Sequence, residues 1–134
     1  MRGLPLLIRM ARQRADERRV ILVEAESQTR LAAEVLAGQE THLRRETERA
    51  RGEPEAMAMW SDWSRVAAGR QRHLRQALTA LQAQEEQIRD CLREDFAEIK
   101  RLEIARDAAA KAARREAGRR AERTAEDAEL RRRR

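Results

Sequence analysis

The chain has 134 residues, of which 40% are charged, 41% hydrophobic and only 2% aromatic. Ala, Glu, Lys, Leu and Arg account for 86 of them, well above the roughly one-half that marks long helices and coiled coils. One Phe and no Tyr leave little from which to build a sandwich, a barrel or an α/β enzyme. Composition and length therefore predict a single all-α domain covering residues 1–134.

Charge is distributed unevenly. The formal net charge is +6, and residues 111–134 hold 10 basic and 5 acidic side chains, so this segment accounts for +5 of it. An acidic partner is expected to bind there. The single cysteine, Cys91, excludes a disulfide framework within the chain and suits a reducing compartment.

The first element follows a short hydrophobic cluster, Leu4 to Ile8. This cluster is too short for the core of a signal peptide, and Arg9 and Arg12 follow it without a small-residue cleavage site. No segment of the chain approaches the roughly 18–20 apolar residues that span a bilayer. We expect a cytoplasmic protein that does not insert directly into a membrane.

Proline and glycine divide the chain into two helices. We expect the first helix over about 6–50, a turn over about 51–56, a second helix over about 57–129 and a frayed basic tail over 130–134. Pro54 disfavours helix at Glu53, and Gly52 suits a left-handed C-terminal cap. At 1.5 Å per residue the helices would be roughly 65 Å and 110 Å long.

A heptad pattern predicts that the two helices pair. In the second helix nine of twelve positions on a 4-3 spacing are apolar, and the spacing extends upstream to Trp60; the twelve are Leu74, Leu78, Leu81, Glu85, Ile88, Leu92, Asp95, Ile99, Leu102, Arg106, Ala109 and Ala113. The first helix has a weaker seam, which Arg18, Gln39 and Glu46 interrupt: Ile8, Ala11, Ala15, Leu22, Ala25, Ala32, Leu36 and Leu43. A narrow apolar stripe on a charged helix needs a partner, and the short turn supplies one.

The predicted fold is a long antiparallel two-helix coiled coil whose second helix is longer than the first. Opposite charges four residues apart support the exposed faces, as in Glu26/Arg30, Glu40/Arg44, Glu85/Arg89 and Glu116/Arg120. Residues of about 105–134 would extend beyond the first helix. Alanines keep this extension thin and helical, because alanine has the highest helix propensity.

The sequence shows no pattern typical of catalysis. His42, His73 and Cys91 have no zinc-site spacing, and the five glycines stand singly, so no metal, cofactor or nucleotide loop is predicted. A two-helix hairpin encloses no pocket that could tune a catalytic group. We therefore expect a protein that is not an enzyme, with both histidines in solvent.

Two segments favour interaction with other macromolecules. Residues 57–66 contain both tryptophans, Trp60 and Trp63, and two of the four methionines; Trp60 lies on the seam, whereas packing and docking remain equally open for Trp63 and Val66. The basic segment 111–134 is compatible with a solvated helix face, with nucleic acid or with an acidic protein. Interleaved acidic residues and the absence of aromatic residues there disfavour nucleic acid.

The order of these features resembles the FliJ family of flagellar type III export stalk proteins and their relatives in virulence secretion. The resemblance consists of a break after the first helix, the opening Trp60-Ser-Asp-Trp63-Ser-Arg-Val66, a Leu/Ile heptad run, Lys100-Arg101-Leu102-Glu103 and a charged Ala/Arg/Glu tail. It implies a stalk that enters and activates a hexameric export ATPase, docks on the cytoplasmic domain of the export gate at the inner membrane, and handles export chaperones.

The resemblance also implies two sets of partner-binding residues and no catalytic, cofactor-binding or metal-binding residue. The gate-facing set is Trp60, Trp63, Val66, Leu74, Leu36, Gln39 and Leu43. The ATPase-facing set is Leu6, Leu7, Arg9, Arg12, Leu102, Arg106, Arg114, Arg115, Arg119 and Arg120. Two alternatives remain open: a basic coiled-coil protein that binds nucleic acid or ribosomes, and a homodimeric coiled-coil scaffold.

Overall fold

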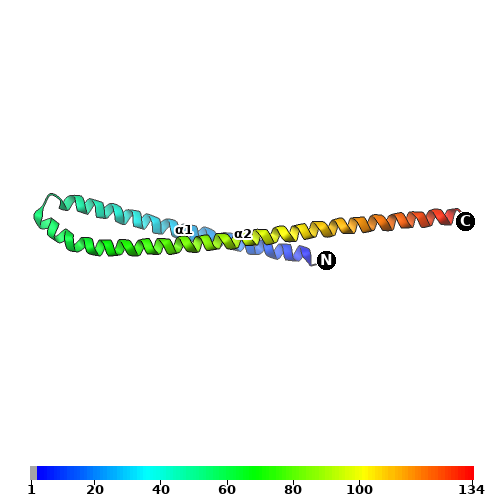
Figure 1. Ribbon diagram of the computed structural model, residues 1–134, viewed down its shortest axis with the longest axis horizontal. Helices are drawn as coiled ribbons and strands as arrows, with labels where there is room; N and C mark the ends of the chain where they lie inside the picture. The colour runs from blue at the N-terminus through cyan, green and yellow to red at the C-terminus, as the bar shows by residue number, and fades with distance from the viewer. Residues whose placement is uncertain (1–2) are drawn as a thin grey trace. The chain divides into compact units, whose positions relative to one another are not determined.

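The computed structural model describes residues 3–134, which form two helices and no strand (Figure 1). Helix α1 spans Leu4–Ala50 and helix α2 spans Pro54–Arg132. The predicted all-α hairpin with a longer second helix is confirmed. Both helices extend beyond their expected bounds: α2 begins at Pro54 rather than near 57, because proline is compatible with the first turn of a helix, and Arg131 and Arg132 are helical rather than frayed.

The turn differs from its expected form. No described glycine has a positive φ, so Gly52 does not supply the left-handed cap that the sequence suggested. The turn is closed instead by the Glu53 N–H, which donates to the Ala50 carbonyl at 3.3 Å, and by the Met57 N–H, which donates to the Glu53 carbonyl at 3.0 Å. These bonds join the end of α1 to the start of α2 across only three residues.

Contacts divide the chain into two units. The terminal unit comprises described residues 3–16 and 93–134, and the tip unit comprises residues 17–92, including the turn. In the tip unit α1 and α2 run antiparallel on either side of the turn (Figure 1, cyan and green). Each unit has its own section of the heptad seam.

The seam of the tip unit is half-buried to buried at every position of a 4-3 spacing on both helices. Arg18, Gln39 and Glu46, which interrupt the apolar pattern of α1, occupy the same face as their apolar neighbours. The largest well-buried side chain of this seam is Leu92, at 8% exposure. The period therefore determines which face is covered, even where the residue type is polar.

The buried seam of α1 in the terminal unit combines two large residues, Leu4 and Ile8, with two alanines. Ala11 and Ala15 are each 2% exposed, and Ile8 is 3% exposed. Asp95 is buried on the α2 side, at 9% exposure. Because alanine is short, this part of α1 can lie close against α2.

Ion pairs between the helices flank both seams. In the terminal unit Arg12 pairs with Glu103 at 3.2 Å and Arg14 with Glu98 at 3.5 Å. In the tip unit Arg75 pairs with Glu40 at 3.2 Å. Glu40 was expected to form an ion pair with Arg44 along its own helix, but its ion pair is with Arg75 of the other helix.

A second interhelical ion pair of the tip unit belongs to a small network. Arg89 contacts Glu26 of α1 at 3.5 Å, as well as Glu85 and Glu86 of its own helix. Partial burial lowers the pKa of Arg89, but its hydrogen bond with Glu85 and the three carboxylate charges raise the pKa by more. The guanidinium therefore remains charged, and the Glu85/Arg89 pair follows the sequence prediction.

Candidate functional site

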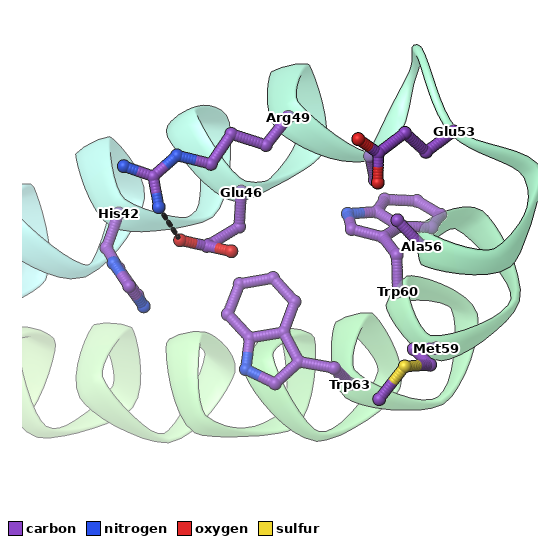
Figure 2. Close-up of a pocket in the computed structure, with 9 residues that line it drawn as sticks. His42, Glu46, Arg49, Glu53, Ala56, Met59, Trp60 and Trp63 are labelled. Carbon is purple, nitrogen blue, oxygen red and sulfur yellow. Dashed lines mark hydrogen bonds and ion pairs between the residues drawn. The ribbon is translucent and has the colours of Figure 1, made fainter.

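Trp60 and Trp63 project from the first turns of α2 toward α1 (Figure 2). Trp60 is half-buried on the seam, as predicted, and its Nε1–H donates to Thr47 Oγ1 at 3.0 Å. The Thr47 hydroxyl in turn donates to the Leu43 carbonyl at 2.7 Å. This chain of two hydrogen bonds fixes the indole against α1, so Trp60 has a packing role at the end of the hairpin.

Trp63 lies beside the seam and packs against His42. The two rings meet edge to face, with centroids 5.7 Å apart and planes at 83°. Such a geometry places the positive edge of one ring against the π face of the other. His42 was expected to be a purely solvated residue; it is exposed, but it also supports one side of a tryptophan that remains half-exposed.

A hollow of about 690 Å³ lies at the tip, lined by residues of both helices that include His42, Trp60 and Trp63. No pocket was expected in a two-helix hairpin. An ion pair of α1 lies in the lining of the hollow, where Arg49 Nη1 is 3.2 Å from Glu46 Oε1 (Figure 2). The nine lining residues are His42, Glu46, Arg49, Ala50, Glu53, Ala56, Met59, Trp60 and Trp63. Indole and thioether surfaces beside a guanidinium suit an apolar or aromatic side chain of a partner.

The other residues of the predicted gate-facing set fall into two classes. Val66 is 73% exposed and fully available to a partner. Four residues are half-buried seam residues, so much of each side chain is used within the coil: Leu36, Gln39, Leu43 and Leu74. Met59 belongs to the interaction segment 57–66 but not to the gate-facing set; it is 77% exposed and lies next to Trp60 on the rim of the hollow.

The predicted ATPase-facing residues all belong to the terminal unit. Leu6 and Leu7 are 56% and 47% exposed, on the face of α1 away from the seam, whereas Leu102 is half-buried. A second hollow of about 460 Å³ lies beside the seam and includes Arg9, Arg12 and Arg106 in its lining. Three arginines and one acidic residue, Asp16, therefore line this hollow.

Beyond Ala109, α2 has no packing partner within the described chain. Every residue of 110–134 is exposed. Opposite charges one turn apart brace this extension: Arg120 lies 3.5 Å from Glu116, and Arg133 lies 3.8 Å from Glu129. The remaining predicted arginines are exposed on the same stretch, at positions 114, 115 and 119.

Two further observations concern chemistry. In residues 3–134 no three His, Cys, Asp or Glu side chains gather closely enough to hold a metal ion. Cys91 is a half-buried free thiol. The tip presents aromatic and sulfur groups, and the extension presents charges of both signs.

Comparison with protein-family models, with curated proteins and with solved structures gives no match to this chain. Within the described part of the chain, neither helix contains a stretch long and apolar enough to cross a membrane.

Proposed function

We propose that this protein is a non-enzymatic stalk and coupling component of a flagellar-type protein export apparatus. The observation that carries the proposal is the extension 110–132 of α2, a helix that is exposed on all sides and consists largely of Ala, Arg and Glu. A single helix is only about 10–12 Å across. It fits a narrower axial opening than a pair of helices does, so we place it in the ring of a hexameric export ATPase, with the ATPase-facing residues of α1 in the same terminal unit.

The tip supports the second half of the proposal. Met59 and the half-buried Trp63 line the hollow, and Val66 is exposed on the same helix. Exposed aromatic and methionine side chains are typical of protein interfaces. We assign this surface to the cytoplasmic domain of the export gate. The same surface would receive export chaperones, and these contacts would hold the protein peripherally at the cytoplasmic face of the inner membrane.

The first test measures hydrolysis by the export ATPase of the same organism with and without this protein. We expect stimulation that peaks near one stalk per hexamer. The variant Arg114→Ala/Arg115→Ala/Arg119→Ala/Arg120→Ala keeps or raises helix propensity, so it removes charge without removing the helix. It should abolish stimulation, whereas Trp63→Ala should leave stimulation unchanged.

The second test measures binding to the purified gate domain with the same two variants in reversed roles. Trp63→Ala should weaken binding while the circular dichroism at 222 nm stays unchanged, and the four-arginine variant should bind normally. A large loss of helicity in Trp63→Ala would assign this residue to packing. If the wild-type protein does not affect the ATPase but is retained on DNA or RNA with steep salt dependence, the nucleic-acid alternative replaces the export proposal.

A further inference from the structure

The two sides of the coil in the tip unit differ strongly in charge. Each seam residue has one neighbour just before it and one just after it, and these lie on opposite sides of the seam because successive residues are about 100° apart. Arg75 and Arg89 follow seam residues, and both bind glutamates of α1. Trp63 and His42 precede seam residues and meet on the other side. We call these sides the ion-pair flank and the Trp63 flank.

Charge is sparse on the α2 part of the Trp63 flank. On α2 its eleven positions, spaced alternately three and four residues apart from 56 to 91, contain one charged residue, Arg70. The ten corresponding positions of the ion-pair flank, from 58 to 89, contain five. In a chain that is 40% charged, a helix face with one charge in eleven positions is suited to being covered. On α1 the ten flank positions from 17 to 49 contain four charged residues, Glu17, Glu24, Arg45 and Arg49.

The same flank exposes large apolar side chains from both helices. Ile21, Leu31 and Val35 of α1 are 53%, 56% and 52% exposed, and Met59 and Val66 of α2 are 77% and 73% exposed. Five of the eight exposed large hydrophobic residues of the tip unit therefore lie on this one flank. A contiguous apolar strip on a soluble helix pair marks an interaction surface.

The few charges of the flank are ordered along α1. Glu24 precedes an uncharged run of flank positions from Gln28 to His42, and Arg45 follows it. Glu24 lies 11 residues before Val35 and Arg45 lies 10 residues after it. Outside the flank positions, acidic residues such as Glu34 and Asp62 occur at intervals on both helices, so they do not set a direction.

We propose that the Trp63 flank binds a second copy of this chain in an antiparallel, two-fold symmetric arrangement. Such an arrangement places the uncharged middle of one α1 against that of the other, Glu24 against the second copy's Arg45, and Leu31 against the second copy's Gly38. It buries Val35 near the symmetry axis. With α1 packed on α1, a parallel arrangement would bring Glu24 against Glu24 and Arg45 against Arg45, whereas the antiparallel one pairs opposite charges.

This inference does not depend on the export function, although it affects it. Trp63 and Val66 belong both to the proposed gate contact and to this flank. Self-association and gate binding would therefore exclude each other, and a dimer would be a form that is not docked on the gate.

Sedimentation equilibrium of the full-length chain from about 1 to 200 µM at low salt tests the proposal. We expect the mass to rise from 15.6 kDa toward twice that value. Val35→Lys should weaken dimerisation on the order of a hundredfold, since two valines per dimer lose their burial. The matched control is Val23→Lys, since Val23 is 66% exposed on the same helix but lies off the flank; it should leave the dimer unchanged.

Charge reversal tests the direction. Glu24→Arg and Arg45→Glu should each weaken the dimer about tenfold, and the double variant should restore it. A monomer at every concentration, or equal effects of Val35→Lys and Val23→Lys, would overturn the proposal. If the wild type dimerises but the double variant does not regain the wild-type affinity, the antiparallel arrangement is wrong. Binding of the gate domain by a strictly monomeric protein would leave the export proposal standing alone.

Discussion

The hydrogen bond between Trp60 and Thr47 offers a quantitative test of what holds the end of the hairpin together. Trp60→Phe removes the donor, and Thr47→Val removes the acceptor with little change of shape. The two changes are not equivalent. Trp60→Phe leaves the Thr47 hydroxyl bonded to the Leu43 carbonyl at 2.7 Å, whereas Thr47→Val leaves a half-buried indole N–H with no acceptor.

The free energies follow from this difference. Loss of one intramolecular hydrogen bond costs about 0.5–1.5 kcal/mol, and a polar group left unsatisfied in a buried place costs about 1–3 kcal/mol. Since Trp60 is only half-buried, we expect Thr47→Val to cost near the lower end of the second range, about 1 kcal/mol. Trp60→Phe should cost about 1–2 kcal/mol, because it also removes part of the indole surface.

The double variant isolates the interaction. If the bond exists, the double variant loses about 1 kcal/mol less than the sum of the single variants. Urea unfolding, followed by circular dichroism at 222 nm, measures the free energy of unfolding of the wild type, the two single variants and the double variant. In a thermal melt, a difference of 1 kcal/mol corresponds to roughly 3–5 °C in Tm for a chain of this size. Additivity within about 0.3 kcal/mol would refute the reasoning and show that the two side chains stabilise the tip independently.

Three further perturbations test the seam, an interhelical ion pair and the extension. Leu92→Ala should destabilise the chain by about 2–3 kcal/mol in urea because Leu92 is 8% exposed, and Leu130→Ala, at 63% exposure, should change stability by less than about 0.5 kcal/mol. The pKa of Glu40 lies below its ordinary value, chiefly because Arg75 hydrogen-bonds to it; the ion pair therefore adds stability above about pH 4 and loses it as pH falls through the lowered pKa. Glu40→Gln should lower Tm at pH 7, and a Tm difference that persists at pH 2 would contradict this assignment. Ala110→Gly should cost about 1 kcal/mol of local helix stability, measured as faster amide hydrogen exchange in the extension, with no change near Trp60.

The fold was predictable because a heptad period and a single pair of breakers leave few arrangements open. The seam of α2 from Leu74 to Leu102 is half-buried or buried at each predicted position. The weaker seam of α1 holds as well, since Gln39 and Glu46 stay on the covered face. Ala113 follows the spacing but is exposed, because the seam requires a facing helix and not merely a pattern. Arg106 also follows the spacing and is exposed, although it lines a hollow with residues of α1.

The site was less predictable because it depends on the register between the helices, that is, on which residues of α1 lie opposite which residues of α2. The sequence identified Trp60 as a seam residue, but nothing in a single helix indicates that its N–H meets Thr47. His42 was assigned to solvent because its own helix offers it no partner. Both residues become recognisable once the short turn fixes the register, since His42 and Trp63 each precede a seam position and therefore lie on the same side.

The two candidate surfaces differ in the physics of binding, and salt concentration separates them. The extension exposes alanines and charges of both signs, so its contacts with a partner are electrostatic and are screened over about 10 Å at 0.1 M salt. The surface around Trp63, Met59 and Val66 is apolar, and apolar burial does not weaken with salt. Raising the salt from 50 to 300 mM should therefore weaken binding through the extension severalfold while binding through the tip changes little. Equal salt dependence of ATPase stimulation and gate binding would show that one surface serves both partners, and the division of labour between the two units would then be wrong.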